Sequence, residues 1–560
     1  MMSSKLWINK APSQELVYEF VSQGFFTPLL AKILINKGFS DVKSAYSFLY
    51  PRLSDFSDPF IIPDMKLAVE RIYKAIKFGE KICIYGDSDA DGIIGTFVLY
   101  DFLKSFTPYV EWLIPSKELE GYGFHAKFLP YFKERGISLV ITVDVGISAY
   151  HTVNSAKALS IDVIITDHHE IINKPETITV TGKLTPPSSP FYYLCGAGVA
   201  FALIRALRTY LFSQGFFADR ELPFLRKYLE LVCLATLADM VPIKGENRLI
   251  TFFGFRDLLN PFFPCTKVLL EKADLKIGLS EEDINFKIIP KINSAGRLGK
   301  PEVAFEFLTS SDKTYAEKEF SKIESLNQER QALEEEILNS TISQFDENFK
   351  NSNFLFLVFK NISKGLLGLI ANRFKNLYNL PTIVISQENE VAHGSVRSPS
   401  RINFLNIISQ CKDLLIQFGG HKYALGFKIY KELIPQLKYR LEELMKNYKP
   451  DTPSVEPIYI DAETSLSELL YRENVFAFEQ FHPYGEGHLP PALLLKNFEI
   501  KEIKVLKEKH SKLILQKEGK ELSAIFFNKL LENNEIKLIV GTPFINSFTG
   551  NLEIKVEDAK

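Results

Sequence analysis

Cysteine is scarce in this chain of 560 residues, and its five cysteines are scattered along the sequence. They are odd in number and form no Cys-x-x-Cys pair. This pattern excludes a disulfide framework and argues against a structural zinc site. We interpret the cysteines as buried, reduced thiols of a cytosolic protein. They are Cys83, Cys195, Cys233, Cys265 and Cys411.

Net charge and long apolar runs are also lacking. The chain has 66 Lys and Arg against 68 Asp and Glu, so any surface that binds nucleic acid must be local. The longest uncharged stretch, residues 184–204, is interrupted by prolines and glycines and does not predict a membrane-spanning helix. Residues 1–14 lack the apolar core of a signal peptide. We therefore expect a cytoplasmic protein that does not contact a membrane.

The length predicts several domains, because single hydrophobic cores stop growing at roughly 250 to 300 residues. Up to about Asp239, short β-rich runs alternate with helical patterns, which predicts a parallel sheet with crossover helices. The charged stretch from Ser311 lacks glycine and proline and predicts a long helix between two lobes. The predicted divisions are a helical segment packing on the core (1–77), an α/β core (78–310), the connecting helix (311–350), a second α/β domain (351–448) and a small β-barrel or β-sheet domain (453–560).

Three aspartates, Asp87, Asp89 and Asp91, crowd the end of the first β-rich run. Carboxylates this close repel one another and raise each other's pKa unless a cation neutralises them. The alternative is a solvated turn, since Asp and Gly both favour turns. A calcium loop of the EF-hand type is disfavoured, because Val98 and Leu99 occupy the region of its closing Glu.

Polar groups also follow the next two β-rich runs, Asp144 after one and Asp167, His168 and His169 after the other, and Asp239 ends a later uncharged run. Taken singly, each could be a helix cap, a surface histidine or a helix-end carboxylate. Because functional groups gather beyond the carboxyl ends of parallel strands, we expect them to lie together. Carboxylates with one imidazole suit Mn²⁺ or Mg²⁺ better than Zn²⁺. Five or six such ligands are enough to hold two metal ions, and a pair of divalent cations in one site can hydrolyse phosphate esters.

Several segments resemble a known family. The segments IYGDSDADG, ITVDVG and ITDHHE resemble the first three motifs of the DHH phosphoesterase superfamily, which is named after the triplet at 167–169. Further segments stand in the order seen in the RecJ family of bacterial single-strand exonucleases, and this order covers nearly the whole chain. They are CGAGVAFALIRAL, LATLADMVPIKGENR, PKINSAGRL, SLNQERQ, GSVRS, FGGHKYALG and FHPYGEGHLPP.

The resemblance implies roles for individual residues. Two Mn²⁺ or Mg²⁺ ions would be held by Asp87, Asp89, Asp91, Asp144, His168 and Asp239. Catalytic contacts to the scissile and neighbouring phosphates would come from His169, Asn293 and Arg297, beside the ligand Asp144. The 5′ end of the strand would be bound by Lys117, Ser395, Arg397, Gly419, Gly420 and His421. The resemblance also implies a DHH-associated second lobe and an OB-like fold for the C-terminal barrel.

The chain departs from the family pattern at several positions. Val145 stands where a polar residue is usual, and Lys117 and Lys291 stand where arginine is commoner. Ile362 and Ser363 replace the Trp-His that usually opens the helix of the second lobe. Because lysine is a point charge and not a bidentate fork, Lys117 and Lys291 predict a weaker grip on phosphate.

We therefore predict a metal-dependent 5′→3′ exonuclease that hydrolyses single-stranded DNA to mononucleotides in repair and recombination. One alternative is a small-substrate DHH phosphodiesterase that acts on short oligonucleotides or dinucleotides, but such an enzyme needs no C-terminal barrel. Another is a catalytically silent DHH scaffold in a replication complex, which should have lost several ligand positions.

The stretch 501–520 in the predicted barrel carries seven lysines against three glutamates. A basic face of this kind tracks a nucleic-acid backbone, and a solvated hairpin is the alternative. The predicted partners are single-stranded DNA, single-strand-binding protein and a helicase, and we expect a monomer.

Overall fold

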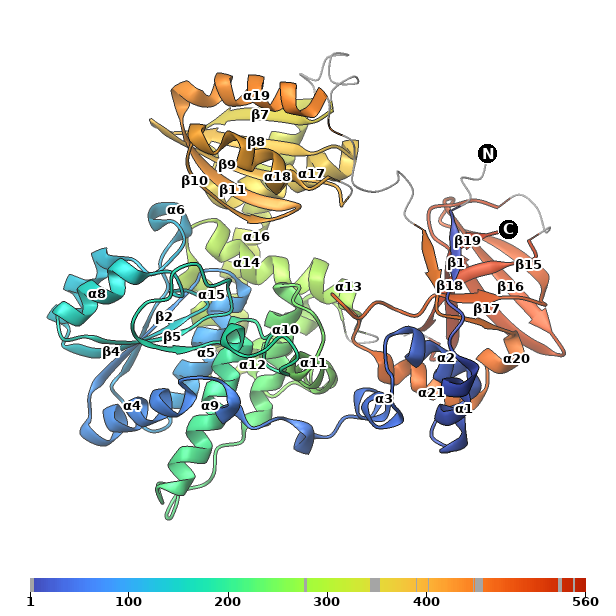
Figure 1. Cartoon of the computed structure of the whole chain (residues 1–560), viewed down its shortest axis with the longest axis horizontal. Coiled ribbons are helices and arrows are strands. Elements are labelled where there is room, and N and C mark those ends of the chain that lie inside the picture. The colour runs from blue at the N-terminus through green and yellow to red at the C-terminus, as the bar shows by residue number, and fades with distance from the viewer. Residues whose placement is uncertain are drawn as a thin grey trace.

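The computed structural model describes residues 5–275, 279–342, 353–388, 390–400, 402–446, 448, 457–531, 536–546 and 549–560. Three bodies are visible in Figure 1: an α/β core, a smaller α/β domain above it and a β domain to one side. The helix α16 (Lys313–Ile342) runs from the core to the smaller α/β domain. Among the described residues, no helix combines the length and apolar character that crossing a bilayer requires.

The core is built on a five-stranded, fully parallel sheet in the order β3-β2-β4-β5-β6. Its strands are nearly continuous apolar runs, as expected for a sheet buried on both faces. Alternate side chains point to opposite faces of the sheet. Ile82 and Ile84 therefore pack in the apolar cluster on one face, and Cys83 and Tyr85 pack in the cluster on the other. The strands are β2 (Lys81–Gly86), β3 (Val110–Leu113), β4 (Ile137–Val143), β5 (Asp162–Thr166) and β6 (Ile178–Val180).

Helices cover both faces of this sheet, as predicted. One face packs against α4 (Met65–Phe78), α5 (Ala90–Lys104) and α9 (Gly196–Ser213). The other packs against α7 (Leu129–Glu134) and α8 (Tyr150–Ala158). The rest of the core is helical: α6 (Lys117–Glu120), α10 (Leu229–Ala238), α11 (Glu246–Asp257), α12 (Pro264–Lys272), α13 (Glu281–Asp283), the π-helix η6 (Ile284–Ile288), α14 (Ile289–Arg297) and α15 (Pro301–Leu308).

The long connecting helix is confirmed over the described part of its predicted range, and residues 343–350 lie outside the described residues. Phe320 and Ile323 of α16 pack in the apolar cluster of the core. Leu333 and Ile337, further along, pack in the smaller domain. The helix therefore holds both lobes by its own apolar side chains.

The smaller α/β domain has a five-stranded sheet in the order β10-β11-β9-β8-β7, in which only the β7–β8 pair is parallel. One face packs against α17 and the other against α18 and α19. The elements are β7 (Leu355–Lys360), α17 (Lys364–Tyr378), β8 (Thr382–Gln387), β9 (Val391–Arg397), α18 (Phe404–Ile408), β10 (Leu415–His421), β11 (Ala424–Tyr430) and α19 (Ile434–Lys446).

The β domain has a seven-stranded sheet in the order β13-β14-β18-β19-β17-β16-β15. Its elements are β12 (Ile458–Ile460), β13 (Ala462–Thr464), α20 (Leu466–Leu469), α21 (Arg472–Phe481), β14 (Leu493–Leu495), β15 (Glu499–Leu506), β16 (His510–Lys517), β17 (Lys520–Phe526), β18 (Ile539–Ile545) and β19 (Leu552–Ala559).

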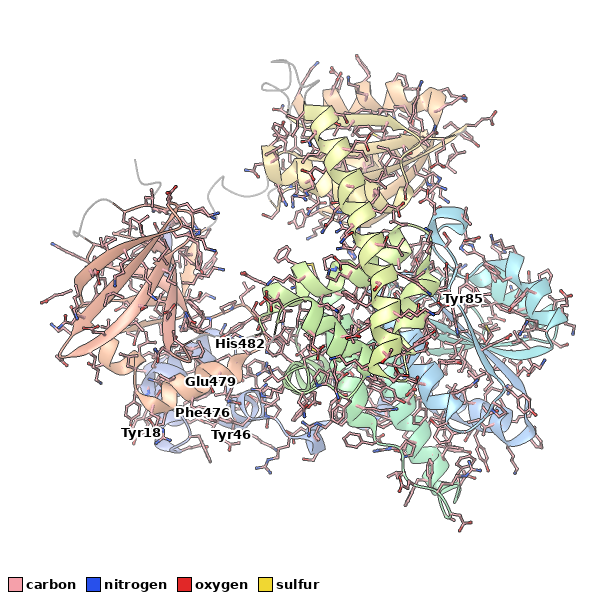
Figure 2. All side chains as sticks on the ribbon, turned by 180° about the vertical axis from the view of Figure 1, so that it is seen from behind. Tyr18, Tyr46, Tyr85, Phe476, Glu479 and His482 are labelled. Carbon is pink, nitrogen blue, oxygen red and sulfur yellow. The ribbon has the colours of Figure 1, made fainter. Side chains whose placement is uncertain are left out.

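The prediction that residues 1–77 pack on the core is wrong for most of that segment. Strand β1 (Trp7–Asn9) pairs with β12, at the other end of the chain. The helices α1 (Gln14–Ser22), α2 (Pro28–Asn36) and α3 (Val42–Leu49) bury their apolar faces in the cluster of the β domain. Figure 2 shows Tyr18 and Tyr46 of these helices in the same body as Phe476 of α21, on whose ring Tyr50, at the end of α3, stacks with ring centroids 6.2 Å apart. From this segment, α4 is the helix that packs on the core sheet.

The β domain and the core are joined by a buried arginine. Arg248 of α11 is 3% exposed and donates to the carbonyls of Phe48, Gln480, Phe481 and His482 at 2.5 to 3.2 Å. No carboxylate pairs with it among the described residues, and burial lowers the pKa of its guanidinium to about 9. One side chain of the core thus satisfies carbonyls from both ends of the chain.

Arg248→Met is expected to lower the free energy of unfolding by about 3 kcal/mol, because buried carbonyls lose their donors. Methionine keeps apolar bulk at the position, so the loss reports on the hydrogen bonds. Urea unfolding measures the change, with the exposed Arg472→Met on α21 as the matched control. An unchanged unfolding midpoint would show that the hydrogen bonds of Arg248 contribute nothing to stability.

Candidate active site

The end of β2 and the first turn of α5 carry three aspartates: Asp87, Asp89 and Asp91. The amide of Asp87 continues the sheet by donating to Val143 O at 3.2 Å. Asp89 is the N-cap of α5, and its Oδ1 accepts from Gly92 N at 3.2 Å. The two oxygens of Asp91 accept from Gly196 N and Ala197 N at the start of α9, at 2.6 and 2.8 Å. The carboxylates of Asp89 and Asp91 are thus oriented by two helix N-termini, which favour negative charge.

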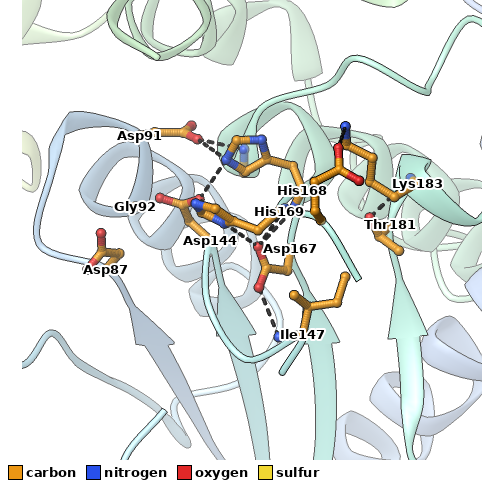
Figure 3. A network of polar contacts seen from close by, with 12 residues as sticks. Asp87, Asp91, Gly92, Asp144, Ile147, Asp167, His168, His169, Thr181 and Lys183 are labelled. Atoms are coloured by element: carbon orange, nitrogen blue, oxygen red, sulfur yellow. Dashed lines mark hydrogen bonds and ion pairs between the residues drawn. The ribbon is translucent and has the colours of Figure 1, made fainter. Parts of the chain in front are cut away.

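Asp144 follows β4 directly in a left-handed conformation, with φ 62°. Its amide donates to Thr166 O at 2.9 Å, and its Oδ1 lies 3.0 Å from His168 Nε2. The same imidazole nitrogen lies 3.8 Å from Asp91 Oδ2 and 3.5 Å from Asp239 Oδ2. Figure 3 shows His168 reaching between Asp91 and Asp144. The structure therefore brings together the side chains of all three strand ends and of the end of α10.

The donor set fits divalent cations. Among the described residues, three groups have ligand atoms within 4.8 Å of one another: Asp91, His168 and Asp239; Asp87, Asp89 and Asp144; and Asp144, His168 and His169. Asp144 Oδ1 and His168 Nε2 are buried and, although they lie 3.0 Å apart, neither makes a hydrogen bond to the other or to any other group of the described residues. Such unsatisfied buried atoms are costly unless a ligand completes them.

The pKa values of the clustered side chains without a bound cation also indicate a site for divalent cations. Burial, reinforced by the neighbouring carboxylates, raises the pKa of Asp91 to about 7, that of Asp239 to about 8 and that of Asp144 well above its usual range. Burial lowers the pKa of His168 to about 4, so its imidazole is neutral and free to bind a metal. The cluster therefore holds more carboxylates than there are positive charges to neutralise them.

Lys117 lies closer to the carboxylates than its predicted role at the 5′ end suggested. Its ammonium contacts Asp87 and lies 3.2 Å from Asp89 Oδ2. Burial opposes the charge, but the two aspartates outweigh it and raise the pKa of Lys117 above its usual range. A cationic side chain thus stands beside two of the candidate metal ligands.

His169 is held by two partners. Its Nδ1 lies 2.8 Å from Oδ1 of the buried Asp167, which also accepts from Ile147 N, 2.9 Å from its Oδ2 (Figure 3). The hydroxyl of Tyr122 lies 3.0 Å from His169 Nδ1 and 3.2 Å from the carbonyl of Asp144. The sequence analysis missed Tyr122, although the glycines on either side of it signal an exposed turn near the site. Asp167 orients the histidines and belongs to none of the three donor groups.

The candidate catalytic residues of α14 border a cavity of about 280 Å³. Asn293 Oδ1 accepts from Ala90 N at 2.8 Å, which ties α14 to the aspartate turn. Arg297 and Asp239 line the same cavity. Gly296 has no room for a side chain, because a Cβ there would lie 1.8 Å from Ser88 O. Lys291 faces the other way and pairs with Glu324 of α16.

The smaller domain closes the cavity through the start of α17. Ser363 Oγ donates to Glu118 Oε2 at 2.7 Å, and Lys364 Nζ donates to Glu118 O at 3.0 Å. Gly365 lies against the backbone of Arg297. The departure at Ser363 therefore supplies a contact between the lobes. Val145, the other departure, is a buried member of the apolar cluster beneath the site.

Of the residues predicted to bind the 5′ end, Ser395, Arg397, Gly419 and His421 lie in two rows across the smaller sheet. Ser395 pairs with Gly426, which pairs with Gly419, while Arg397 pairs with Ala424, which pairs with His421. Directly paired residues point to the same face, so both rows share one face. A Cβ on Gly419 would meet nothing within 4 Å, which leaves this face open. Gly420 has φ 134° and packs on Leu425, so its glycine is needed for the backbone.

Three family models match the chain: the DHH family N-terminal domain over residues 81–236, the DHHA1 domain over 351–447 and the RecJ OB domain over 460–558. The single-stranded-DNA-specific exonuclease RecJ of Bacillus subtilis is 33% identical over 539 residues, which cover 94% of this chain and 66% of the relative. The chain belongs to the RecJ family. It spans about two thirds of the length of that relative.

Two solved RecJ structures extend the comparison. RecJ of Thermus thermophilus in complex with Mn²⁺ matches with a TM-score of 0.81 at 26% identity, over 100% of this chain and 80% of that one. Its complex with Mg²⁺ matches with a TM-score of 0.74 at 26% identity, over 100% and 79%. The fold class predicted from the sequence is confirmed. The predicted ions are those of the two RecJ complexes, and the donor set of this chain fits them.

Proposed function

We propose that this member of the RecJ family is a metal-dependent exonuclease that removes mononucleotides from the 5′ end of single-stranded DNA in repair and recombination. One observation carries the proposal. The cavity lined by Asp89, Asp91 and Asp239 is bordered on the side of the smaller domain by Gly365 of α17. Gly368, one turn further along α17, lies against the side chains of Ser395 and Arg397. Metal donors alone treat every phosphodiester alike, and an anchoring site beyond them selects a chain end.

The residues of the chain have distinct parts in the reaction. Two divalent cations held by the aspartates and His168 would supply Lewis acidity toward the scissile phosphate and lower the pKa of a nearby water. Burial disfavours the charged form of His169, but Asp167 outweighs this and raises the pKa of His169 to about 9. His169 is therefore protonated near pH 7 and can donate from Nε2 to a phosphate oxygen. Tyr122 and Asp167 fix the plane of its ring.

Phosphates next to the scissile bond meet the side chains of α14 and Lys117. Arg297 carries a permanent charge at the wall of the cavity, although burial lowers its pKa. Lys117 reaches the same cavity from α6. We propose that these two cations hold the strand in line for attack, while Asn293 keeps the aspartate turn in place.

Digestion of single strands labelled at the 5′ or the 3′ end tests the proposal. With Mn²⁺ or Mg²⁺, a 5′ label is expected to appear first as a mononucleotide while a 3′ label stays on a shrinking strand, and EDTA is expected to stop both. Early release of the 3′ label would overturn the polarity. No hydrolysis with either metal would favour the silent scaffold.

A small-substrate phosphodiesterase is disfavoured by the C-terminal domain, which an enzyme for dinucleotides does not need. Its lysines are less available than their number in the sequence suggested. Lys501, Lys504 and Lys512 pair with Glu521, Glu502 and Glu553. Lys507 and Lys509, in the turn after β15, have no ion pair among the described residues, and we propose that they contact phosphates.

Lys507→Gln combined with Lys509→Gln is expected to weaken binding to a long single strand and to flatten its salt dependence. Each phosphate contact on a single strand contributes about 0.7 to the slope of log K against log salt, so two lost contacts reduce the slope by about 1.4. Fluorescence anisotropy in EDTA measures binding without hydrolysis. The double variant Lys267→Gln and Lys272→Gln on α12 is the matched control. An unchanged slope would remove this turn from the binding surface.

We also propose a cytoplasmic monomer that works with a helicase and single-strand-binding protein. All five cysteines are free and buried, which supports a reducing compartment. Light scattering measures the oligomeric state, and addition of purified single-strand-binding protein to the digestion measures the partnership. A stable dimer would contradict the first part, and an unchanged rate would contradict the second.

A further inference from the structure

The contact between α6 and the start of α17 joins the two lobes beside the cavity. Figure 1 shows α6 on the side of the core that faces the smaller domain. Ser363 Oγ, at the N-cap of α17, lies 2.7 Å from Glu118 Oε2 and 3.2 Å from Arg297 O. Lys364 Nζ donates to Glu118 O at 3.0 Å. A Cβ on Gly365 would lie 2.4 Å from Arg297 O, so the backbones also meet. The start of α17 is therefore fixed to α6 and to the end of α14.

The core side of this contact leads directly to the candidate metal donors. Lys117 precedes Glu118 on α6, contacts Asp87 and lies 3.2 Å from Asp89 Oδ2. Because α6 (Lys117–Glu120) is a single short turn, the two neighbouring side chains move together. The position of Glu118 is therefore tied to that of the aspartates.

The other side of the contact leads to the proposed anchor for the 5′ end. Gly368 lies on the same continuous helix as Lys364, further along α17. A Cβ on Gly368 would lie 2.7 Å from a terminal nitrogen of Arg397 and 3.5 Å from Ser395 Oγ. The anchor thus rests on the helix whose start is held by Glu118. A connected path of short contacts therefore runs from the metal donors to the anchor.

We propose that the contact of Glu118 with Ser363 sets the length of the released product, because it fixes the distance between the metal donors and the anchor for the 5′ phosphate. The inference rests on the proposed function. When the 5′ phosphate is held at the anchor, this distance decides which phosphodiester reaches the metals. Hydrolysis of the first phosphodiester by water releases a mononucleotide, and hydrolysis of the second releases a dinucleotide.

Release of a dinucleotide requires the lobes to move apart. One more nucleotide between the anchor and the metals adds about 3.4 Å to a stacked strand, and more to an extended one. Hydrogen bonds are lost beyond about 3.5 Å, so this opening breaks both the contact of 2.7 Å from Ser363 and that of 3.0 Å from Lys364. The contact therefore disfavours the dinucleotide. Glu118 belongs to none of the three donor groups and acts as a positioning residue.

A single strand with a radioactive 5′-terminal phosphate tests the proposal, because the label leaves once, on a mononucleotide or on a dinucleotide. The wild-type chain is expected to release it almost entirely on the mononucleotide. With Glu118→Ala, the ratio of dinucleotide to mononucleotide is expected to rise about tenfold or more, the factor that one lost hydrogen bond to a charged group supplies. Glu118→Gln is expected to keep the wild-type ratio, because its amide oxygen still accepts from Ser363 Oγ.

Further variants test whether the effect comes from this contact. Ser363→Ala removes the same hydrogen bond, so it is expected to match Glu118→Ala, and the double variant is expected to exceed neither. Gly365→Ala places a methyl group against the backbone of α14 and is expected to raise the ratio by separating the lobes. Glu388→Ala is the matched control, because Glu388 lies 3.9 Å from Lys364 but within the smaller domain. It is expected to keep the wild-type ratio.

The outcomes separate the inference from the function on which it rests. The ratio compares two products of one reaction, so it does not depend on the fraction of folded protein. If Glu118→Ala and Ser363→Ala lower the rate but keep the wild-type ratio, the contact is merely structural, and the inference is wrong while the exonuclease stands. A raised ratio in Glu388→Ala would also overturn the inference. If the wild-type chain does not release the label, the proposed function is wrong and the inference falls with it.

Discussion

Asp144→Asn is expected to abolish hydrolysis of single-stranded DNA with Mn²⁺ and with Mg²⁺, while the chain keeps its fold. Asp144 belongs to two of the three donor groups, and its Oδ1 lies 3.0 Å from Nε2 of His168 in the third, so its loss affects the whole cluster. Asparagine keeps the size of the side chain and tolerates the left-handed backbone at φ 62°, which alanine does not. The rate is expected to fall by more than about a hundredfold, because changes outside the ligand shell already cost ten- to a hundredfold.

The same substitution is expected to leave the metal-free protein at least as stable as the wild type. Asp144 is buried, and burial together with Asp91 and Asp89 raises its pKa well above the usual range, so its ionised form is unfavourable without a cation. Bound metal stabilises the wild type by about 2.7 kcal/mol at a hundred times its Kd, and the variant should lose most of this gain. Thermal melting with EDTA and with Mn²⁺ measures both effects.

Asp274→Asn provides a matched control, because Asp274 also has a left-handed backbone, with φ 55°, and is exposed at the end of α12. It is expected to retain full activity and the full response to Mn²⁺. Substantial hydrolysis by Asp144→Asn under saturating Mn²⁺ would mean that the metals do not depend on this carboxylate, and the two-ion site would have to be abandoned.

The clustering of the candidate metal donors could be predicted from the sequence because the physics that places them is local. Asp87, Asp144 and His168 each follow an apolar run, and parallel strands deliver such residues to one edge. The sequence contains each strand and its end, and the topology rule supplies the rest. Asp239 follows a helix and not a strand, and it was predicted from the uncharged run before it together with the family resemblance.

Contacts between distant segments could not be predicted in this way. The amphipathic pattern of α2 and α3 shows that each helix buries one face, but it does not say which body covers that face. The structure places them on the β domain, where β1 pairs with β12. The contact of Lys117 with Asp87 depends on the fold of the loop before α6, which leaves no periodic signal. Tyr122 was missed for the same reason.

Arg397→Ala is expected to cut activity on 5′-phosphorylated strands by about ten- to a hundredfold and to reduce the preference over 5′-hydroxyl ends. A lost charge-assisted hydrogen bond costs about 1.5 to 3 kcal/mol, which gives this range. The guanidinium donates to Ser395 Oγ at 3.2 Å and Val396 O at 2.9 Å, and no carboxylate pairs with it among the described residues. Burial lowers its pKa, but the group stays charged. Its remaining donors are free to bind an anion.

Gly368→Ala tests the same site without removing the charge. A Cβ on Gly368 would lie 2.7 Å from a terminal nitrogen of Arg397, so the guanidinium must move aside. The preference for 5′-phosphorylated ends is expected to fall here too, by less than in Arg397→Ala because the side chain can still reach the phosphate. Arg440→Ala is the matched control in the same domain, since Arg440 already pairs with Asp413 on the surface.

The two kinds of strand end decide between anchoring and a purely structural role for Arg397. An anchor acts through the terminal phosphate, so its loss falls mainly on the phosphorylated strand and the two ends become alike. A structural arginine supports the sheet whichever strand is bound, so its loss lowers both rates by the same factor. Equal losses on the two substrates would therefore refute the anchoring role, and release of mononucleotides from the 3′ end by the wild-type chain would refute the polarity itself.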